Sequence, residues 1–140
     1  MTSLFDELYQ LGTKRINFGG GEPLIKKHIK EIVAYARGKG FVCNMNTNGH
    51  LVPKRMDVVK MLNSLCISID GSEEEHDGSK GAGSYKRVLN AISLAKENGI
   101  KYPVWRCILC GQFYLTEHHF HKARHIVFPF FHRIIIAVYA

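Results

Sequence analysis

The sequence lacks an apolar stretch long enough to cross a membrane as a helix. Its longest apolar run, residues 126–140, is interrupted by His132 and Arg133, whereas a spanning helix needs about 20 predominantly apolar residues. The first residues, MTSLFDELYQL, also lack the basic start and apolar run of a secretory signal. We therefore expect a cytoplasmic protein with no membrane partner.

Acidic residues are outnumbered, yet the basic residues form no continuous patch. The 19 lysines and arginines exceed the 12 acidic residues and give a formal net charge of +7. No run of five or more basic residues occurs, and no basic stripe alternates with aromatic residues. Nucleic-acid-binding domains cluster their positive charge on one face or along one helix. A basic nucleic-acid binder is therefore a weaker alternative than a dispersed, solvated basic surface.

The sequence contains four cysteines in 140 residues. In a cytosolic chain, cysteines are expected to be free thiols or metal ligands rather than disulfides. Cys43 and Cys66 lie inside apolar runs, so we expect them to be small core residues. The length and the 46% hydrophobic content fit one globular domain at most.

The first hundred residues alternate short apolar strands with amphipathic helices. We expect strands at residues 15–18, 41–45, 64–69 and from 100 onward. Helices are expected from residue 24 to 38, from Pro53 to Leu62, and from a cap at Ser84 to residue 98, the last after a polar loop. Because each helix supplies a crossover, the strands should pair in parallel, as in a (β/α) barrel or an open doubly wound sheet.

Each expected strand ends in a cluster of glycine and polar residues. These clusters are residues 19–23, residues 47–49 and Asp70-Gly71. The carboxyl ends of parallel strands share one rim, where ligands bind in such folds. Residues 19–23 match neither the dinucleotide GxGxxG nor the P-loop pattern, and a plain tight turn is an alternative for this segment alone. The three ends together favour a ligand site.

The combination resembles the radical S-adenosylmethionine (SAM) superfamily over roughly residues 8–103. INFGGGEPLI is similar to the family's GGEP strand and loop, NTNG to the end of the next strand, and SLCISIDG to the strand after that. The following stretch, from EEEHDGSK to ENGIK, resembles members that modify peptides or mature cofactors. The resemblance implies an α/β fold: a partial (β/α) TIM-like barrel of parallel strands with outer helices, incomplete at both ends.

The resemblance also implies a SAM site at the rim of this sheet. Eight residues match the family's motifs there: Gly20, Gly21, Glu22, Pro23, Thr47, Asn48, Ser68 and Asp70. The first four match the motif whose backbone meets the SAM amino group, the next two match a strand end close to SAM, and the last two match an end that faces the ribose or the methionine carboxylate. In the family a [4Fe–4S] cluster, held by three cysteines, reduces SAM to a 5′-deoxyadenosyl radical that abstracts hydrogen from a substrate, which is a peptide in some full-length members.

The sequence departs from the family at the cluster. The family's CxxxCxxC motif lies in a loop before the GGEP strand, and residues 3–12 resemble the end of the helix that follows this loop. No cysteine precedes Ile16, however, and the four cysteines present form no such triplet. Cluster ligation needs thiolates at fixed geometry. We therefore expect a fragment of a radical SAM enzyme that binds SAM as a small molecule, has no catalytic residue of its own and is inactive alone.

The composition changes near residue 105, which predicts a core at 1–104 and a divergent tail at 105–140. After Lys101 the only acidic residue is Glu117, whereas five of the eight histidines lie there. The weak metal-ligand candidates are Cys107, Cys110, His121 and His125, although the gap between Cys110 and His121 is shorter than zinc fingers use. A noncatalytic binding module with a Cys/His metal-binding tail is therefore the alternative function.

Overall fold

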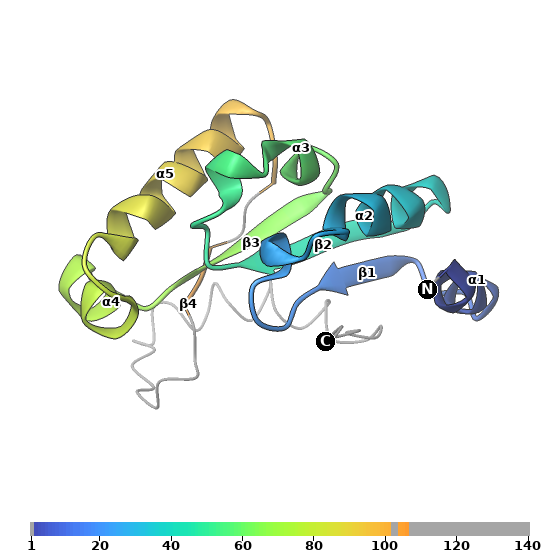
Figure 1. The fold of residues 1–140 in the computed structure, drawn as a ribbon, viewed down its shortest axis with the longest axis horizontal. Helices are drawn as coiled ribbons and strands as arrows, with labels where there is room; N and C mark the ends of the chain where they lie inside the picture. Colours follow the sequence, from blue (N-terminus) through green and yellow to red (C-terminus); the bar gives the residue numbers. More distant parts are fainter. Residues whose placement is uncertain (1, 102–103, 107–140) are drawn as a thin grey trace, which may run out of the picture.

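The computed structural model describes residues 2–101 and 104–106, which form a parallel sheet with helices (Figure 1). The strands are β1 (Arg15–Phe18), β2 (Val42–Thr47), β3 (Ser64–Ile69) and β4 (Val104–Arg106), paired in the order β1-β2-β3-β4. All three pairings are parallel, with Ile16 opposite Cys43, Met45 opposite Leu65 and Ser68 opposite Trp105. The carboxyl ends of the strands therefore lie at one edge of the sheet.

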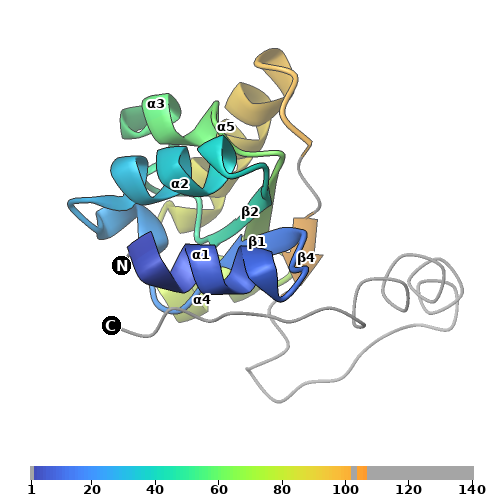
Figure 2. The same cartoon turned by 90° about the vertical axis from the view of Figure 1, so that its right-hand side faces the viewer.

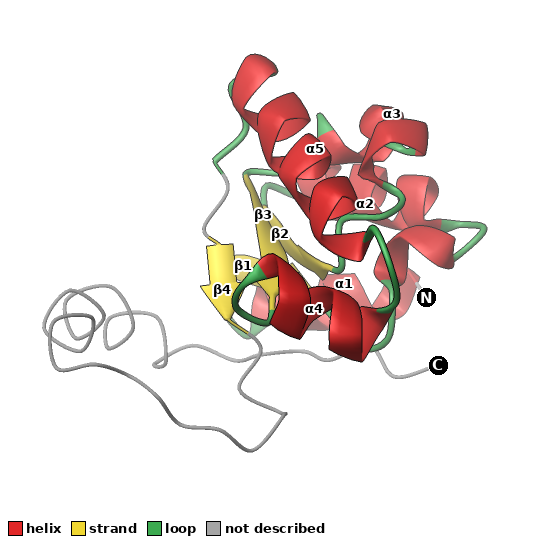
Figure 3. Cartoon of the chain, turned by 90° about the vertical axis from the view of Figure 1, so that its left-hand side faces the viewer, coloured by secondary structure: helices red, strands yellow, loops and turns green. Residues whose placement is uncertain are grey.

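Helices α2 (Ile29–Gly38), α3 (Met56–Val59) and α5 (Ser84–Glu97) lie on one face of this sheet, and α4 (Glu73–Lys80) follows the carboxyl end of β3 (Figures 1 and 3). Two 3₁₀ turns, Pro23–Ile25 and Val52–Lys54, precede α2 and α3. Helix α1 (Thr2–Gln10) runs beside the sheet (Figure 2) and places the Phe5 ring 5.9 Å from that of Tyr35 and 6.1 Å from that of Phe41, centroid to centroid.

Strand alternation makes the two faces of the sheet chemically different. Along β2, Cys43, Met45 and Thr47 are buried, whereas Asn44 is half-buried and Asn46 is exposed. Successive strand side chains point to opposite faces, so the buried set meets the helices and joins one apolar core. The other face is polar, and there the Ser64 hydroxyl donates to Asn44 Oδ1 at 2.8 Å.

The predicted α/β fold class is confirmed: helices connect the parallel strands of one sheet. The strands expected at 15–18 and 64–69 and the helix expected in residues 3–12 are present as β1, β3 and α1. The second strand runs to Thr47, two residues beyond its expected end. No helix in the described part of the chain is long and apolar enough to span a membrane.

Four local predictions were wrong. The polar loop expected after β3 contains α4, and Ser84 does not cap α5, because the cap is Gly83 with φ 72° and Ser84 is buried inside the first turn. The helix expected from Pro53 is a 3₁₀ turn followed by the four-residue α3, which ends before Leu62. Ile25, expected on an apolar helix face, is 68% exposed. The predicted division at residue 104 stays a prediction, because residues 107–140 lie outside the described ones.

Candidate functional site

The three polar strand ends lie along the carboxyl edge of the sheet, because β1, β2 and β3 are neighbours and parallel. The turn after β1 contains Gly20, whose φ of 112° lies in the region that favours glycine. A Cβ built on Gly21 would meet no atom within 4 Å. The turn therefore has open space beside its backbone at Gly21, as close approach of a ligand requires.

Glu22 joins this turn to the end of β2. Its Oε1 and Oε2 lie 2.8 and 2.9 Å from the donating Thr47 hydroxyl, and Oε2 accepts from the Asn48 backbone N–H at 2.8 Å. Oε1 also accepts from the Leu24 N–H at 3.2 Å, which caps the 3₁₀ turn at Pro23–Ile25. These donors occupy the Glu22 carboxylate. A ligand at this turn would therefore meet the backbone of residues 20–23, and Glu22 would position that backbone.

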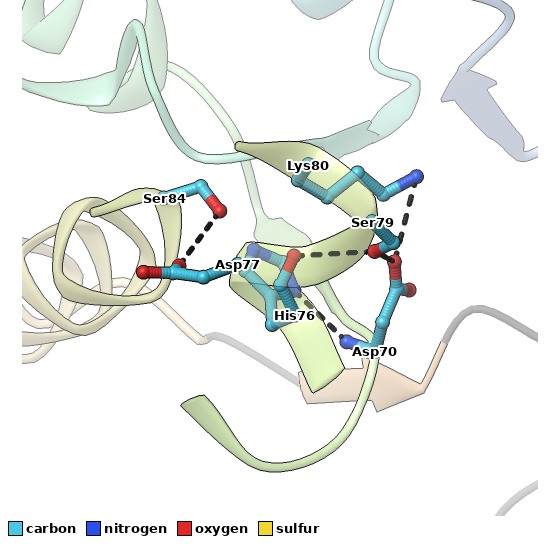
Figure 4. Close-up of polar contacts among 6 residues, drawn as sticks. All are labelled: Asp70, His76, Asp77, Ser79, Lys80 and Ser84. Atoms are coloured by element: carbon cyan, nitrogen blue, oxygen red, sulfur yellow. Dashed lines mark hydrogen bonds and ion pairs between the residues drawn. The ribbon is translucent and has the colours of Figure 1, made fainter. Parts of the chain in front are cut away.

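Asp70 is an enclosed carboxylate at the rim, with a side chain only 6% exposed. Its Oδ2 accepts from the Ser79 hydroxyl at 2.9 Å and lies 3.5 Å from Lys80 Nζ, and its backbone N–H donates to His76 Nδ1 at 3.1 Å (Figure 4). Oδ1 is buried and has no partner among the described residues. Buried polar atoms are rarely left unpaired, so this oxygen is suited to accept a hydrogen bond from a ligand.

Ser68 lies two residues before Asp70, at the carboxyl end of β3. Residues two apart on a strand share a face, which places Ser68 on the polar face with half-buried Cys66. The structure thus brings the predicted residues to one edge in three groups, at residues 20–23, 47–48 and 68–70.

His76 and Asp77 lie in the segment after β3 that the sequence predicts as a polar loop. His76 instead belongs to α4 and is 3% exposed. Asp77 accepts from the backbone N–H of Gly83 at 2.6 Å and of Tyr85 at 2.8 Å, and from the Ser84 hydroxyl at 3.0 Å. The bond from Tyr85 and then that from Gly83 lower the pKa of Asp77, against an opposing effect of burial. Asp77 therefore fastens the start of α5 to α4.

A signal for α4 was present in the sequence. Ser72 and Glu75 form a capping box, in which the Ser72 hydroxyl accepts from the Glu75 N–H and the Glu75 carboxylate accepts from the Ser72 N–H. The pattern S-x-x-E is a recognised helix start. It could have predicted the helix that carries His76, Ser79 and Lys80 to Asp70.

The described residues do not fit an iron–sulfur cluster. Burial raises the pKa of the Cys43 thiol to about 11 and that of Cys66 to about 12, whereas cluster ligands are thiolates. Within residues 2–101 and 104–106, no group of three or more His, Cys, Asp or Glu side chains could hold a metal ion. The weak candidates Cys107, Cys110, His121 and His125 lie outside the described residues.

The carboxyl edge of the parallel sheet holds a glycine turn, hydroxyl groups and a buried carboxylate. This arrangement defines a ligand-binding α/β domain. The model of the radical SAM superfamily matches residues 2–125, and the chain belongs to this family. The resemblance inferred from the motifs is therefore confirmed.

Curated relatives include Fe-coproporphyrin III synthase of Methanosarcina barkeri, 36% identical over 104 residues that make up 71% of this chain and 26% of the relative. The AdoMet-dependent heme synthase of Nitratidesulfovibrio vulgaris is 31% identical over 107 residues, or 73% of this chain and 29% of the relative. The chain thus spans between a quarter and a third of the length of these relatives.

Among solved structures, the crystal structure of archaeal TYW1 superposes with a TM-score of 0.54 at 18% identity, covering 79% of this chain and 43% of that one. At this identity the likeness concerns the fold alone.

Proposed function

We propose that this chain forms the SAM-binding part of a radical SAM enzyme. The observation that carries the proposal is the buried Asp70 Oδ1, which has no partner in the described part of the chain and lies at the rim that also holds the glycine turn. Family membership supplies the ligand: SAM is the small molecule that radical SAM proteins bind. A SAM molecule has hydroxyl and amino groups that could donate to this oxygen.

Each group of residues has a distinct part in the proposed site. The backbone of Gly20 and Gly21 faces the amino group of SAM, and Pro23 begins the 3₁₀ turn that ends this segment. Glu22 fixes that backbone through Thr47 and Asn48. Ser68 and Asp70 contact the ribose or the methionine carboxylate side. When SAM is bound in a complete site, it supplies the family's radical chemistry, and these residues bind and orient it.

The [4Fe–4S] cluster of the family has no ligand set in this sequence, since its four cysteines include no CxxxCxxC triplet. We therefore assign no step of the reaction to this chain and propose that it is inactive on its own. The cytoplasmic location is likewise a prediction.

For the substrate, the relatives favour cofactor maturation over peptide modification. Two of them are named for the synthesis of Fe-coproporphyrin III and of heme. We propose that the enzyme to which this sequence corresponds acts on an iron porphyrin or its tetrapyrrole precursor. A peptide substrate, which the resemblance alone had left open, has no comparable support.

Titration with SAM tests the proposal. We expect weak binding, with a Kd on the order of millimolar or above, because the cluster that would chelate the methionine end is missing. Binding should vanish in Gly21→Val, whose side chain enters the open space beside the turn, and in Asp70→Ala. Gly38→Ala is the control, since a Cβ there also meets no atom within 4 Å and lies at the end of α2. SAM-dependent shifts in the NMR spectrum that both site variants retain would refute the site.

A further inference from the structure

His76 makes a hydrogen bond that determines which of its ring nitrogens carries the proton. Its Nδ1 accepts from the Asp70 backbone N–H at 3.1 Å (Figure 4). A neutral imidazole has one donor and one acceptor nitrogen, so the proton lies on Nε2. The ring is 3% exposed and meets the Tyr85 ring edge-on, with centroids 6.1 Å apart. His76 is thus held in one orientation, with a buried Nε2 that has no partner among the described residues.

Helix α4 holds Asp70 at both its backbone and its side chain. His76 binds the backbone N–H, while Ser79 and Lys80, one turn later, contact Oδ2. The Ser79 hydroxyl also lies 3.2 Å from the His76 carbonyl oxygen. Together these contacts leave one atom of the carboxylate, Oδ1, without a partner among the described residues. The orientation of that oxygen therefore depends on α4.

The surroundings of His76 carry charges of both signs. Asp70 faces it from β3, Asp77 follows it on α4, and Tyr85 packs on it from α5. His50 lies near both Arg87 and His76. Burial lowers the pKa of His50 most, followed by the charge of Arg87 and then that of His76. Protonation of His76 would turn Nδ1 into a donor that opposes the Asp70 N–H, and the hydrogen bond would be lost.

We propose that His76 is a positioning residue which, in its neutral Nε2–H form, holds Asp70 so that Oδ1 faces the bound ligand. The proposal rests on the proposed SAM site, because Asp70 is the group through which His76 acts. Helix α4 thus supports the site through Asp70, without a residue of its own in contact with the ligand.

Two substitutions separate positioning from packing. His76→Asn places an amide oxygen near the position of Nδ1, so it keeps an acceptor for the Asp70 N–H. His76→Leu fills the space and removes the acceptor. His28→Asn, at an exposed position before α2, controls for the loss of a histidine. The measurements are the tautomer of ¹⁵N-labelled His76, the hydrogen exchange of the Asp70 amide, and SAM-dependent NMR shifts.

We expect an Nε2–H tautomer in the unsubstituted chain. Exchange of the Asp70 amide should be about three- to tenfold faster in His76→Leu, the effect of one lost hydrogen bond, and near normal in His76→Asn and His28→Asn. SAM binding should weaken in His76→Leu, which has no acceptor for the Asp70 N–H, and stay near normal in His76→Asn and His28→Asn.

An Nδ1–H tautomer, or an Asp70 amide that exchanges equally in the His76→Leu and His76→Asn variants, would overturn the assignment. Absence of SAM binding in the unsubstituted chain would instead overturn the proposed function. The tautomer and the exchange rates would in that case still decide whether His76 holds Asp70, so the two failures are distinguishable.

Discussion

Three donors surround the Glu22 carboxylate: the Thr47 hydroxyl and the backbone N–H groups of Leu24 and Asn48. Thr47 is 2% exposed, and its hydroxyl also accepts from the Gly49 N–H at 3.1 Å. The carboxylate is therefore part of a network that fixes two strand ends relative to one another. Glu22 follows three glycines at the rim, but the three donors occupy its carboxylate, so this carboxylate is not available to solvent or to a ligand.

Replacing Glu22 by alanine should destabilise the fold. Hydrogen bonds to charged groups contribute about 1.5–3 kcal/mol, and the buried Thr47 hydroxyl would lose its acceptor. We expect Glu22→Ala to lower the free energy of unfolding by about 2–3 kcal/mol, measured by urea denaturation at neutral pH. Glu7→Ala, at an exposed position on α1, should change it by less than about 0.5 kcal/mol.

A double-mutant cycle with Thr47→Val then isolates the contact between the two side chains. If Glu22 acts through Thr47, the two single substitutions should cost more in sum than the double substitution costs, with a coupling of about 1 kcal/mol or more. Additive effects would show that Glu22 stabilises the turn through its backbone contacts alone.

Asp77 should make stability depend on acid pH. The Tyr85 N–H, then that of Gly83, holds its pKa below the ordinary value of 3.8, so the folded state favours the ionised form. This contribution is complete above about pH 5, where Asp77 is ionised in the unfolded chain, and is lost as the pH falls through the lower folded pKa. We expect Asp77→Asn to be less stable at pH 7 and to lose less stability on acidification.

The measurement is the thermal unfolding midpoint between pH 2.5 and pH 7. Glu74→Gln, on the exposed side of the same helix, is the matched control and should follow the unsubstituted chain. A midpoint for Asp77→Asn that falls with pH as steeply as that of the control would contradict the assigned role.

At the scale of elements, the strands and helices that could be predicted are those marked by a regular spacing of apolar residues. Residues 64–69 form a strand of alternating buried and half-buried residues, as expected. Helix α4 escaped prediction because its segment, EEEHDGSK, contains no aliphatic residue, and its one buried side chain is His76. The contact between Glu22 and Thr47 could not be predicted either, since it joins residues 25 apart through the pairing of β1 with β2. Only the clustering of strand ends at one rim followed from topology.

Two glycines of this region should respond oppositely to alanine. Gly78 lies inside α4, and a Cβ there would meet no atom within 4 Å. Gly78→Ala should therefore stabilise the chain by about 0.5–1 kcal/mol. Gly81 ends α4 with φ 95°, where a side chain is strained, so Gly81→Ala should destabilise by about 1 kcal/mol or more. Chemical denaturation of both variants checks this, and stabilisation by both would mean that α4 does not end at Gly81 in solution.

At the scale of the whole molecule, the sheet separates the two cysteines of the described region. Cys43 is buried on the helix-covered face beside Met45, whereas Cys66 pairs with Asn46 and shares the polar face with Ser68. Their thiols therefore point to opposite sides of the sheet. A cluster that needs several thiolates around one centre has no such arrangement in this part of the chain.

Anaerobic reconstitution with iron and sulfide should accordingly give no stable [4Fe–4S] species on this chain. Burial keeps the Cys43 and Cys66 thiols protonated at neutral pH, with pKa values of about 11 and about 12, and the sequence has no CxxxCxxC triplet. We expect iron well below four per chain after desalting and no cluster EPR signal after reduction. Cys43→Ala and Cys66→Ala should leave the residual iron unchanged, and Cys107→Ala with Cys110→Ala should do the same. Four irons per chain with a reduced-cluster signal, lost in either pair of substitutions, would show that this sequence carries its own cluster site.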